Sequence, residues 1–139
     1  RPGSKRPPPR QKVGDQVSAA SRAGDIPAVF AHFAPSIEWH AAENSPAAKG
    51  SPHRGHIAIQ KAVFQLIGAE FPDMRIERTE TIDAGEKVVA LGYYVGHRTS
   101  TGKPFRAQFA HIWTIGNGKV TKFQQYVDTW QMADAGKLP

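Results

Sequence analysis

Three side chains towards the end of the chain have the types and spacing that acid–base chemistry needs. His111 lies in the apolar run FAHIWTI, while Tyr126 and Asp128 lie in QYVDTW. A carboxylate, an imidazole and a phenol can together remove a proton, return it and hydrogen-bond an oxygen on which charge develops. Asp128 is the expected general base, because a carboxylate among apolar neighbours is costly to bury unless it is paired or used. The alternatives are an exposed strand end or a salt bridge for Asp128, a hydrogen-bonded core histidine and an ordinary core tyrosine.

Other kinds of chemistry have little support in the sequence. The chain has no cysteine, which excludes disulfides, thiolate nucleophiles and cysteine-based metal sites. His53 and His56 lie three residues apart without an acid at metal-ligand spacing, so we predict no metal site, and Arg54 between them is interpreted as a solvated loop residue. No glycine-rich nucleotide motif or GxSxG sequence occurs, and we predict no cofactor.

The turn at Asn117-Gly118 determines which of these residues share a face. A two-residue turn there predicts a hairpin between strands 105–115 and 120–130, with Gly116 opposite Lys119. In that register His111 and Asp128 lie roughly 13 Å apart at ~3.3 Å per residue, so they would flank a ligand and not form a dyad. One face of the hairpin then collects Phe109, His111, Trp113, Gln124, Tyr126, Asp128 and Trp130.

An apolar wall with a few convergent polar groups is typical of a small-molecule cavity. We therefore predict a hydrophobic small molecule as the partner of this face. Trp39 and His40 alternate on an earlier strand, so they point to opposite faces; Trp39 is favoured as cavity wall and His40 is left open. The predicted substrate-binding residues are Trp39, His40, Phe109, Trp113, Gln124 and Trp130.

The elements that position these residues follow from hydrophobic periodicity and turn signals. Two short helices over 13–23 and 26–34 are separated by Gly24 and by Asp25 as N-cap, and the second ends at Pro35. A strand over 37–41, a loop over 42–55 and a helix over 56–71 follow. Four strands complete the chain, over 74–84, 88–99, 105–115 and 120–130. Helices followed by an antiparallel meander predict an α+β fold with helices on one face of the sheet.

The opposite face of the hairpin is also apolar. It carries Ala110, Ile112, Phe123 and Val127. If the first face holds the helices, this second face needs another cover, and a homodimer formed through the sheet is the simplest one.

Composition and charge limit the class of protein. The 139 residues fit one domain, and the net charge of +6 is concentrated in the first twelve, RPGSKRPPPRQK, which carry +5. The remaining residues have 13 basic and 12 acidic groups, so nucleic-acid binding is not predicted. Residues 1–12 are interpreted as a tail, either a cloning or processing remnant or a docking arm, and 13–139 as the single domain. Without a long apolar run, the prediction is a soluble cytoplasmic protein that does not enter membranes.

Four segments resemble a known family when taken together. They are AGDIPAVFAHFAPSIEWH (23–40), GSPHRG (50–55), TGKPFRAQFAHIWTI (101–115) and GKVTKFQQYVDT (118–129). Over about 13–134 the chain resembles the SnoaL-like, ketosteroid-isomerase-related branch of the nuclear transport factor two-like superfamily. The resemblance implies a cone-shaped α+β barrel, in which three N-terminal helices pack on a strongly curved, mainly antiparallel sheet that encloses a pocket, and a sheet-to-sheet dimer.

The resemblance predicts the fold but leaves several activities open, because proteins of this superfamily catalyse many different reactions. Ala41 stands where steroid isomerases have their basic Asp, so steroid isomerisation is not favoured. Of the Asp-Arg-Asp set of epoxide hydrolases, only Asp128 has a counterpart on the predicted pocket face. Polyketide cyclases match best, at His111, Trp113 and Asp128. The expectation is a cofactor-independent isomerase or aldol-type cyclase acting on a hydrophobic carbonyl compound. The alternatives are a non-catalytic binding protein, a dimerising interaction module and, last, an epoxide hydrolase.

Overall fold

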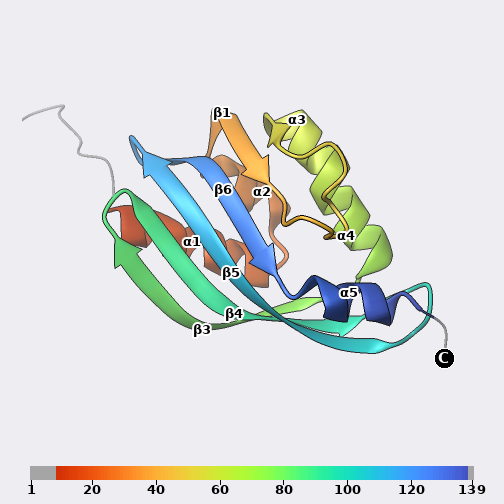
Figure 1. Ribbon diagram of the computed structural model, residues 1–139. Coiled ribbons are helices and arrows are strands. Elements are labelled where there is room, and N and C mark those ends of the chain that lie inside the picture. The colour runs from red at the N-terminus through yellow and green to blue at the C-terminus, as the bar shows by residue number, and fades with distance from the viewer. Residues whose placement is uncertain (1–8, 138–139) are drawn as a thin grey trace, which may run out of the picture.

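The computed structural model describes residues 9–137, which form a curved sheet with helices along its concave side (Figure 1). The helices are α1 (Arg10–Arg22), α2 (Ile26–Ala31), α3 (His56–Ile59), the π-helical turn η1 (Gln60–Phe64), α4 (Gln65–Glu70) and α5 (Thr129–Ala135). The strands are β1 (Phe33–His40), β2 (His53–Arg54), β3 (Arg75–Ala84), β4 (Lys87–His97), β5 (Pro104–Gly116) and β6 (Lys119–Val127). None of the helices in this part of the chain is long and apolar enough to cross a membrane.

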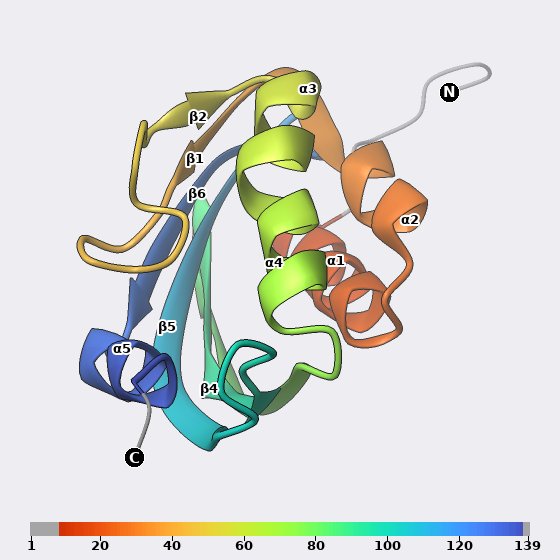
Figure 2. The ribbon, with the colours of Figure 1, turned by 90° about the vertical axis from the view of Figure 1, so that its right-hand side faces the viewer.

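The six strands form one sheet in the order β2-β1-β6-β5-β4-β3. Only β1 and β6 run parallel, and the other neighbours are antiparallel. The sheet curves strongly without closing, and α3 and α4 lie across its concave side, with α1 and α2 beside them (Figure 2). The predicted α+β class, with helices on one face of a curved and mainly antiparallel sheet, is therefore confirmed.

The curvature has a local cause in the β3–β4 hairpin. The pairing shifts by one residue between Arg78 and Glu80, which leaves Thr79 as a bulge. Opposite this point lies Gly92, where an added Cβ would be 2.2 Å from the carbonyl oxygen of Glu77. Only glycine permits this close approach of the two backbones, and the hairpin bends there over the concave side.

The chain becomes helical earlier than the sequence predicts. Residues 10–12, assigned to the tail, form the first turn of α1, and Arg10 Nε donates to the carbonyl oxygen of Ile115 at 3.1 Å. The rest of the predicted tail, residues 1–8, lies outside the described residues. As predicted, the helix stops before Gly24, at φ +70°, and the carboxylate of Asp25 caps α2 by accepting from Ala28 N.

The second helix is shorter than predicted. It ends at Ala31, and Phe33 and Pro35 belong to β1 and not to the helix. The backbone N–H of Val120 donates to the carbonyl of His32 at 2.8 Å, so β6 already pairs with the chain here and prevents further helix. The predicted helix over 56–71 is present as the continuous run α3, η1 and α4, whereas the two-residue strand β2 falls inside a segment predicted to be loop.

The β5–β6 hairpin differs from the predicted register beyond its turn. Gly116 pairs with Lys119 and Ile115 with Val120, as predicted, but Thr114 then pairs with Lys122. Thr121 is therefore an extra residue on β6, a bulge that periodicity does not reveal. Because side chains alternate along a strand, this one-residue shift moves every later side chain of β6 to the opposite face from the one predicted.

The last strand also ends earlier than predicted. β6 stops at Val127, and the carboxylate of Asp128 accepts from the backbone N–H of Gln131 at 3.3 Å, which begins α5. The loop between β4 and β5 holds this helix, because Arg98 Nη1 and Lys103 Nζ donate to carbonyl oxygens of α5 at 3.2 and 3.0 Å. The predicted strand over 120–130 is thus a strand followed by a helix.

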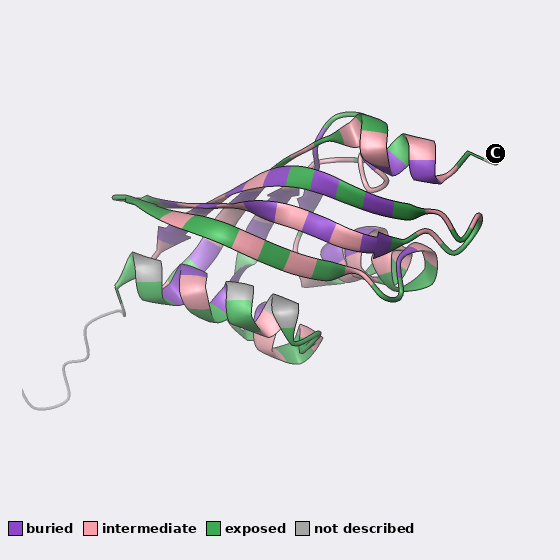
Figure 3. Cartoon of the chain, turned by 90° about the horizontal axis from the view of Figure 1, so that it is seen from below, coloured by how far each residue is buried: buried purple, intermediate pink, exposed green. Residues whose placement is uncertain are grey.

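Buried residues alternate along the strands and separate the two faces of the sheet (Figure 3). A larger core lies between the sheet and the N-terminal helices, and its members include Val13, Val17, Val29, Ile37, Trp39, Trp113 and Phe123. A smaller core lies towards α5 and contains Phe71, Tyr94, Phe105, Ala107, Phe109, Met132 and Ala135.

Candidate functional site

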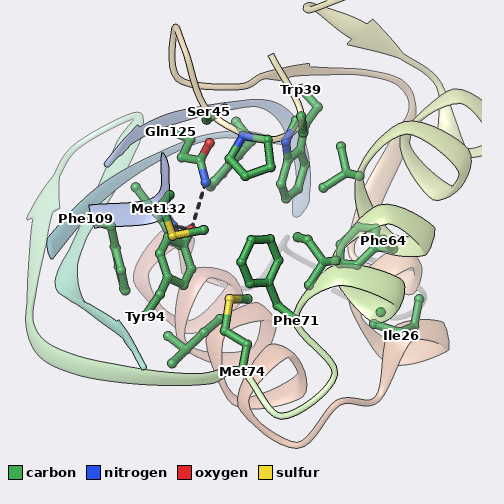
Figure 4. Close-up of a pocket in the computed structure, with 18 of the residues that line it drawn as sticks. Ile26, Trp39, Ser45, Phe64, Phe71, Met74, Tyr94, Phe109, Gln125 and Met132 are labelled. Atoms are coloured by element: carbon green, nitrogen blue, oxygen red, sulfur yellow. Dashed lines mark hydrogen bonds between the residues drawn. The ribbon is translucent and has the colours of Figure 1, made fainter. Parts of the chain in front are cut away.

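A cavity of about 350 Å³ lies between these two cores, on the concave side of the sheet (Figure 4). The sheet, α4, the loop after β1 and Met132 of α5 surround it. Aromatic side chains form much of its wall: Trp39, Phe64, Phe71, Phe109, Trp113 and Phe123. This size falls in the range of small-molecule sites, about 300–1,000 Å³.

Four of the predicted site residues line this cavity. His111 and Trp113 project from the inner face of β5 together with Phe109, and Trp39 projects from β1. His111 is 6% exposed and stacks against the ring of Phe109, with ring centroids 4.0 Å apart. The alternation of β5 placed these side chains correctly because that strand runs without a bulge from Pro104 to Thr114.

Tyr126 and Gln124 do not reach the cavity. Both lie beyond the bulge at Thr121 and therefore project from the outer face of β6. The Tyr126 side chain is 55% exposed, and the amide of Gln124 donates to the carbonyl oxygen of Gln125. The prediction that Tyr126 shares a face with His111 is wrong.

Asp128 and Trp130 are also misplaced by the predicted register. Asp128 is exposed, and its carboxylate caps α5 outside the cavity. Trp130, in the first turn of that helix, is 64% exposed. The assignment of Asp128 as general base is therefore withdrawn, and Trp130 is not a cavity residue.

His40 points away from the cavity. Its Nε2 lies 3.0 Å from Glu38 Oε1, and the other carboxylate oxygen of Glu38 lies 3.6 Å from Arg54 Nε. Hydrogen bonding from His40 is the main cause that lowers the pKa of the Glu38 carboxyl. Of the two neighbours on β1, only Trp39 lines the cavity.

The main polar feature of the cavity was missed by the sequence analysis. Tyr94 of β4 hydrogen-bonds His111 Nε2 through its hydroxyl, and Gln125 Nε2 donates to the same hydroxyl at 3.1 Å (Figure 4). Gln125 Oε1 in turn accepts the backbone N–H of Ala42 at 3.1 Å. Because Gln125 donates to the Tyr94 hydroxyl, that hydroxyl can donate its own proton to His111 Nε2. We therefore assign the ring proton of His111 to Nδ1.

Burial keeps this pair of side chains neutral. It lowers the pKa of His111 to about 3, because an imidazolium would be desolvated between Phe109 and Phe123. Burial also raises the pKa of Tyr94 well above its usual value, and the hydrogen bond from Gln125 opposes this only in part. At neutral pH the site thus presents a phenol O–H and an uncharged imidazole.

Two further polar atoms of lining residues are buried without a partner among residues 9–137. They are Trp113 Nε1 and Ser45 Oγ, the latter in the loop after β1. A buried donor without an acceptor costs about 1–3 kcal/mol, so each needs an explanation. Both residues border the same cavity, but the two atoms themselves are covered, so a bound molecule would reach them only after a side chain moves.

Charged groups are almost absent from the wall. Arg78 of β3 is the one charged side chain among the described lining residues, and no Asp or Glu is among them. No cluster of three His, Asp or Glu side chains within residues 9–137 could hold a metal ion. The wall can therefore supply hydrogen bonds, one positive charge and a weak imidazole base.

The sequence predicts the strands that carry Tyr94 and Gln125, but not that these two side chains point into the cavity. The run VVALGYYV predicts a strand, but its alternation does not say which of Tyr93 and Tyr94 points inward. The pairing of Ala90 with His111 decides this, and it depends on the length of the loop after β4. The predicted register places Gln125 on the outer face beside Phe123 and Val127, because the bulge at Thr121 has no sequence signal.

Comparison with known proteins agrees with this architecture. The chain is 32% identical to an NTF2-like protein of Burkholderia thailandensis, over 91% of this chain and 95% of that one, with a TM-score of 0.86. It is 25% identical to TerC, which was co-crystallized with polyporic acid, over 90% and 95% of the two chains, with a TM-score of 0.76. IdmH of Streptomyces antibioticus, a proposed polyketide cyclase, is 18% identical over 90% and 96%, with a TM-score of 0.74.

The family is decided by the sequence itself. No protein of curated function matches the chain significantly. The model of the SnoaL-like domain matches residues 15–123, which include β1, the helix run α3–α4 and most of the sheet. This chain belongs to the SnoaL-like domain family and has the NTF2-like fold.

Proposed function

We propose that the cavity binds a hydrophobic small molecule with carbonyl oxygens, and that Tyr94 and His111 transfer a proton to and from it. The observation that carries the proposal is the hydrogen-bonded chain from Ala42 through Gln125 and Tyr94 to His111, in the wall of an aromatic cavity.

The order of hydrogen bonds favours a relay. As the Tyr94 oxygen takes a proton from the ligand, its own proton passes to Nε2 of His111. The products are an enolate and an imidazolium, which attract each other in a cavity of low dielectric. A proton returned along the same route to another carbon would complete an isomerisation, and attack of the enolate carbon on a second carbonyl would close a ring.

The weak basicity of His111 restricts the substrate. Burial lowers the pKa of His111 to about 3, so its imidazole is a weaker base than an ordinary histidine. A C–H bond between two carbonyl groups suits such a base best, because that proton is far more acidic than the proton of a simple ketone. The proposed substrates are therefore hydrophobic 1,3-dicarbonyl compounds or their enols.

A non-catalytic binding protein is the second candidate. The absence of Asp and Glu among the described lining residues and the low pKa of His111 favour it. In that case Tyr94 and His111 would hydrogen-bond the ligand without turnover. The same absence of carboxylates from the wall gives no support to epoxide hydrolysis.

One experiment separates these candidates. The keto–enol conversion of 2-acetyl-1-tetralone is followed by absorbance after dilution from an aprotic solvent into buffer, and its binding is measured by calorimetry. Tyr94→Phe should slow the catalysed conversion at least about tenfold, because it removes the relay oxygen. Tyr93→Phe is the matched control and should leave the rate unchanged, since Tyr93 contacts Arg106 on the outer face.

Binding without acceleration by the wild-type protein would favour the binding protein. A lack of binding by both this diketone and polyporic acid, the molecule co-crystallized with TerC, would contradict the proposal as a whole.

We also propose that a second copy of the chain covers the outer face of the sheet. The bulge removes Phe123 and Val127 from that face, where the sequence placed them. Ile112 remains there, together with Tyr126, which is 55% exposed. Light scattering should give the mass of a dimer, and Tyr126→Glu should shift it towards the monomer; a wild-type monomer at 100 µM would contradict this.

A further inference from the structure

Arg78 lies at the bend of the β3–β4 hairpin, on the cavity side of the sheet. It pairs with Gly92, which pairs with Phe109 on the next strand. Neighbouring strands are about 4.8 Å apart, so the backbones at Arg78 and Phe109 are roughly 10 Å apart, and Gly92 between them has no side chain. Both Arg78 and Phe109 line the cavity.

The side chain of Arg78 is mostly buried, but only one of its hydrogen-bond donors has a partner among residues 9–137. It is 19% exposed, and Nη1 donates to Asp15 Oδ1 of α1 at 3.2 Å. Within residues 9–137 this is the only hydrogen bond that the guanidinium makes. A guanidinium has five N–H donors and can bind a second carboxylate alongside the first.

Other charges near Arg78 do not compete for it. Glu77, the preceding residue, projects to the opposite face, where its carboxylate lies 3.6 Å from Arg75 and 3.9 Å from Arg106. Asp15 is the single acidic partner from the packed helix, and its side chain is 46% exposed, so water screens it more than it screens Arg78. Among the described lining residues, a negatively charged group in the cavity would therefore be attracted by Arg78 and repelled by no carboxylate.

We infer that Arg78 is a specificity-determining residue that binds an anionic group of the ligand, a carboxylate or an ionised enol, at the end of the cavity nearest α1. This inference rests on the proposed function, because it assigns a charge to the molecule that the cavity takes. The ligand then has an aromatic or aliphatic body between Phe71 and Phe109, an oxygen at Tyr94 and a negative charge at Arg78. Asp15 positions the guanidinium from outside the cavity.

Two isosteric probes test the assignment by calorimetry at pH 7.5: 2-naphthoate, which is charged, and 2-naphthamide, which is not. Wild-type protein should bind the carboxylate at least about tenfold more tightly than the amide. Arg78→Met should reduce this ratio to about one while leaving amide affinity within about threefold. Arg78→Lys, which keeps the charge without the planar fork, should retain part of the preference.

Asp15→Asn separates a ligand anchor from a purely structural ion pair. The amide oxygen still accepts from Nη1, but the negative charge that partly neutralises the guanidinium is gone, so carboxylate affinity should rise about two- to fivefold while amide affinity stays the same. A structural role alone predicts a change in unfolding temperature and no change in the ratio of affinities.

The outcomes are distinct. Equal affinity of the wild-type protein for the two probes, or an unchanged ratio in both Arg78 variants, overturns the anionic anchor and leaves the cavity proposal standing. If neither probe nor the diketone binds, the proposed function fails and this inference fails with it.

Discussion

The two strands that meet at the Asn117-Gly118 turn behave differently. β5 keeps one alternation over its whole inner face and carries His111 and Trp113 into the cavity. β6 contains a bulge at Thr121, and the residues expected to join them, Tyr126 and Asp128, lie outside. The face on which a strand residue lies can be predicted only when the pairing of that strand with its neighbour is known. One extra residue in a strand moves every later side chain to the opposite face.

Placing a charge on β6 would break this comparison most severely. The bulge at Thr121 turns Phe123 into the core and Gln124 outward, whereas a hairpin without the bulge would do the reverse. Because Phe123 is 1% exposed, we expect Phe123→Asp to cost about 4 kcal/mol or more in the free energy of unfolding, measured with urea. Gln124→Asp is the matched control and should cost less than about 1 kcal/mol. Equal losses, or a larger loss at Gln124, would refute the register.

Truncating the two tryptophans compares the regions directly. Trp113 on β5 is 3% exposed, and Trp130 in α5 is 64% exposed. Trp113→Ala should lower the free energy of unfolding by about 3–4 kcal/mol, and Trp130→Ala by less than about 1 kcal/mol. Urea unfolding followed by circular dichroism measures both, and equal losses would argue against the placement of β6 and α5.

The pH dependence of stability sharpens the comparison at His111. Its folded pKa of about 3 is below its ordinary value of 6.5, so between these values the unfolded chain binds the extra proton. The contribution of neutral, buried His111 to the free energy of unfolding is thus fully present above about pH 6.5. It decreases as the pH falls, by at most about 1.4 kcal/mol per pH unit.

Comparing wild type with His111→Gln isolates this effect, because lowered pKa values at Glu38 and Asp73 act in both proteins. From pH 6 to pH 4.5 the wild type should lose about 1–2 kcal/mol more than the variant, measured by urea unfolding. Parallel curves would mean that the His111 ring is hydrated.

Much of the fold was predictable because it depends on local signals. Gly24 and Asp25 delimit the first two helices, and the turn glycines delimit four strands, within a few residues. The features that were missed need tertiary information. The bulge at Thr121 and the start of α5 at Asp128 have no periodic signature, and α2 ends where β6 pairs with the chain.

The site was also predictable only in part, namely where it depends on strands without a bulge. Residues on the unbulged strand β5 were placed correctly, as was Trp39, whereas everything assigned through β6 was reversed. Tyr94, which provides the partner of His111, could not be found without the pairing of β4 with β5. Burial of Arg78 also escaped prediction, because it results from a bend that no local pattern encodes.

The residues proposed to carry the chemistry lie on the inner face of β5, not at the end of β6. The most direct test of this proposal is the rate of keto–enol conversion of 2-acetyl-1-tetralone with His111→Gln and Asp128→Asn, the latter preserving the cap of α5 because Asn is also a good N-cap. We expect the first variant to be at least about tenfold slower than wild type and the second to be unchanged. Loss of activity in Asp128→Asn with full activity in His111→Gln would contradict the account.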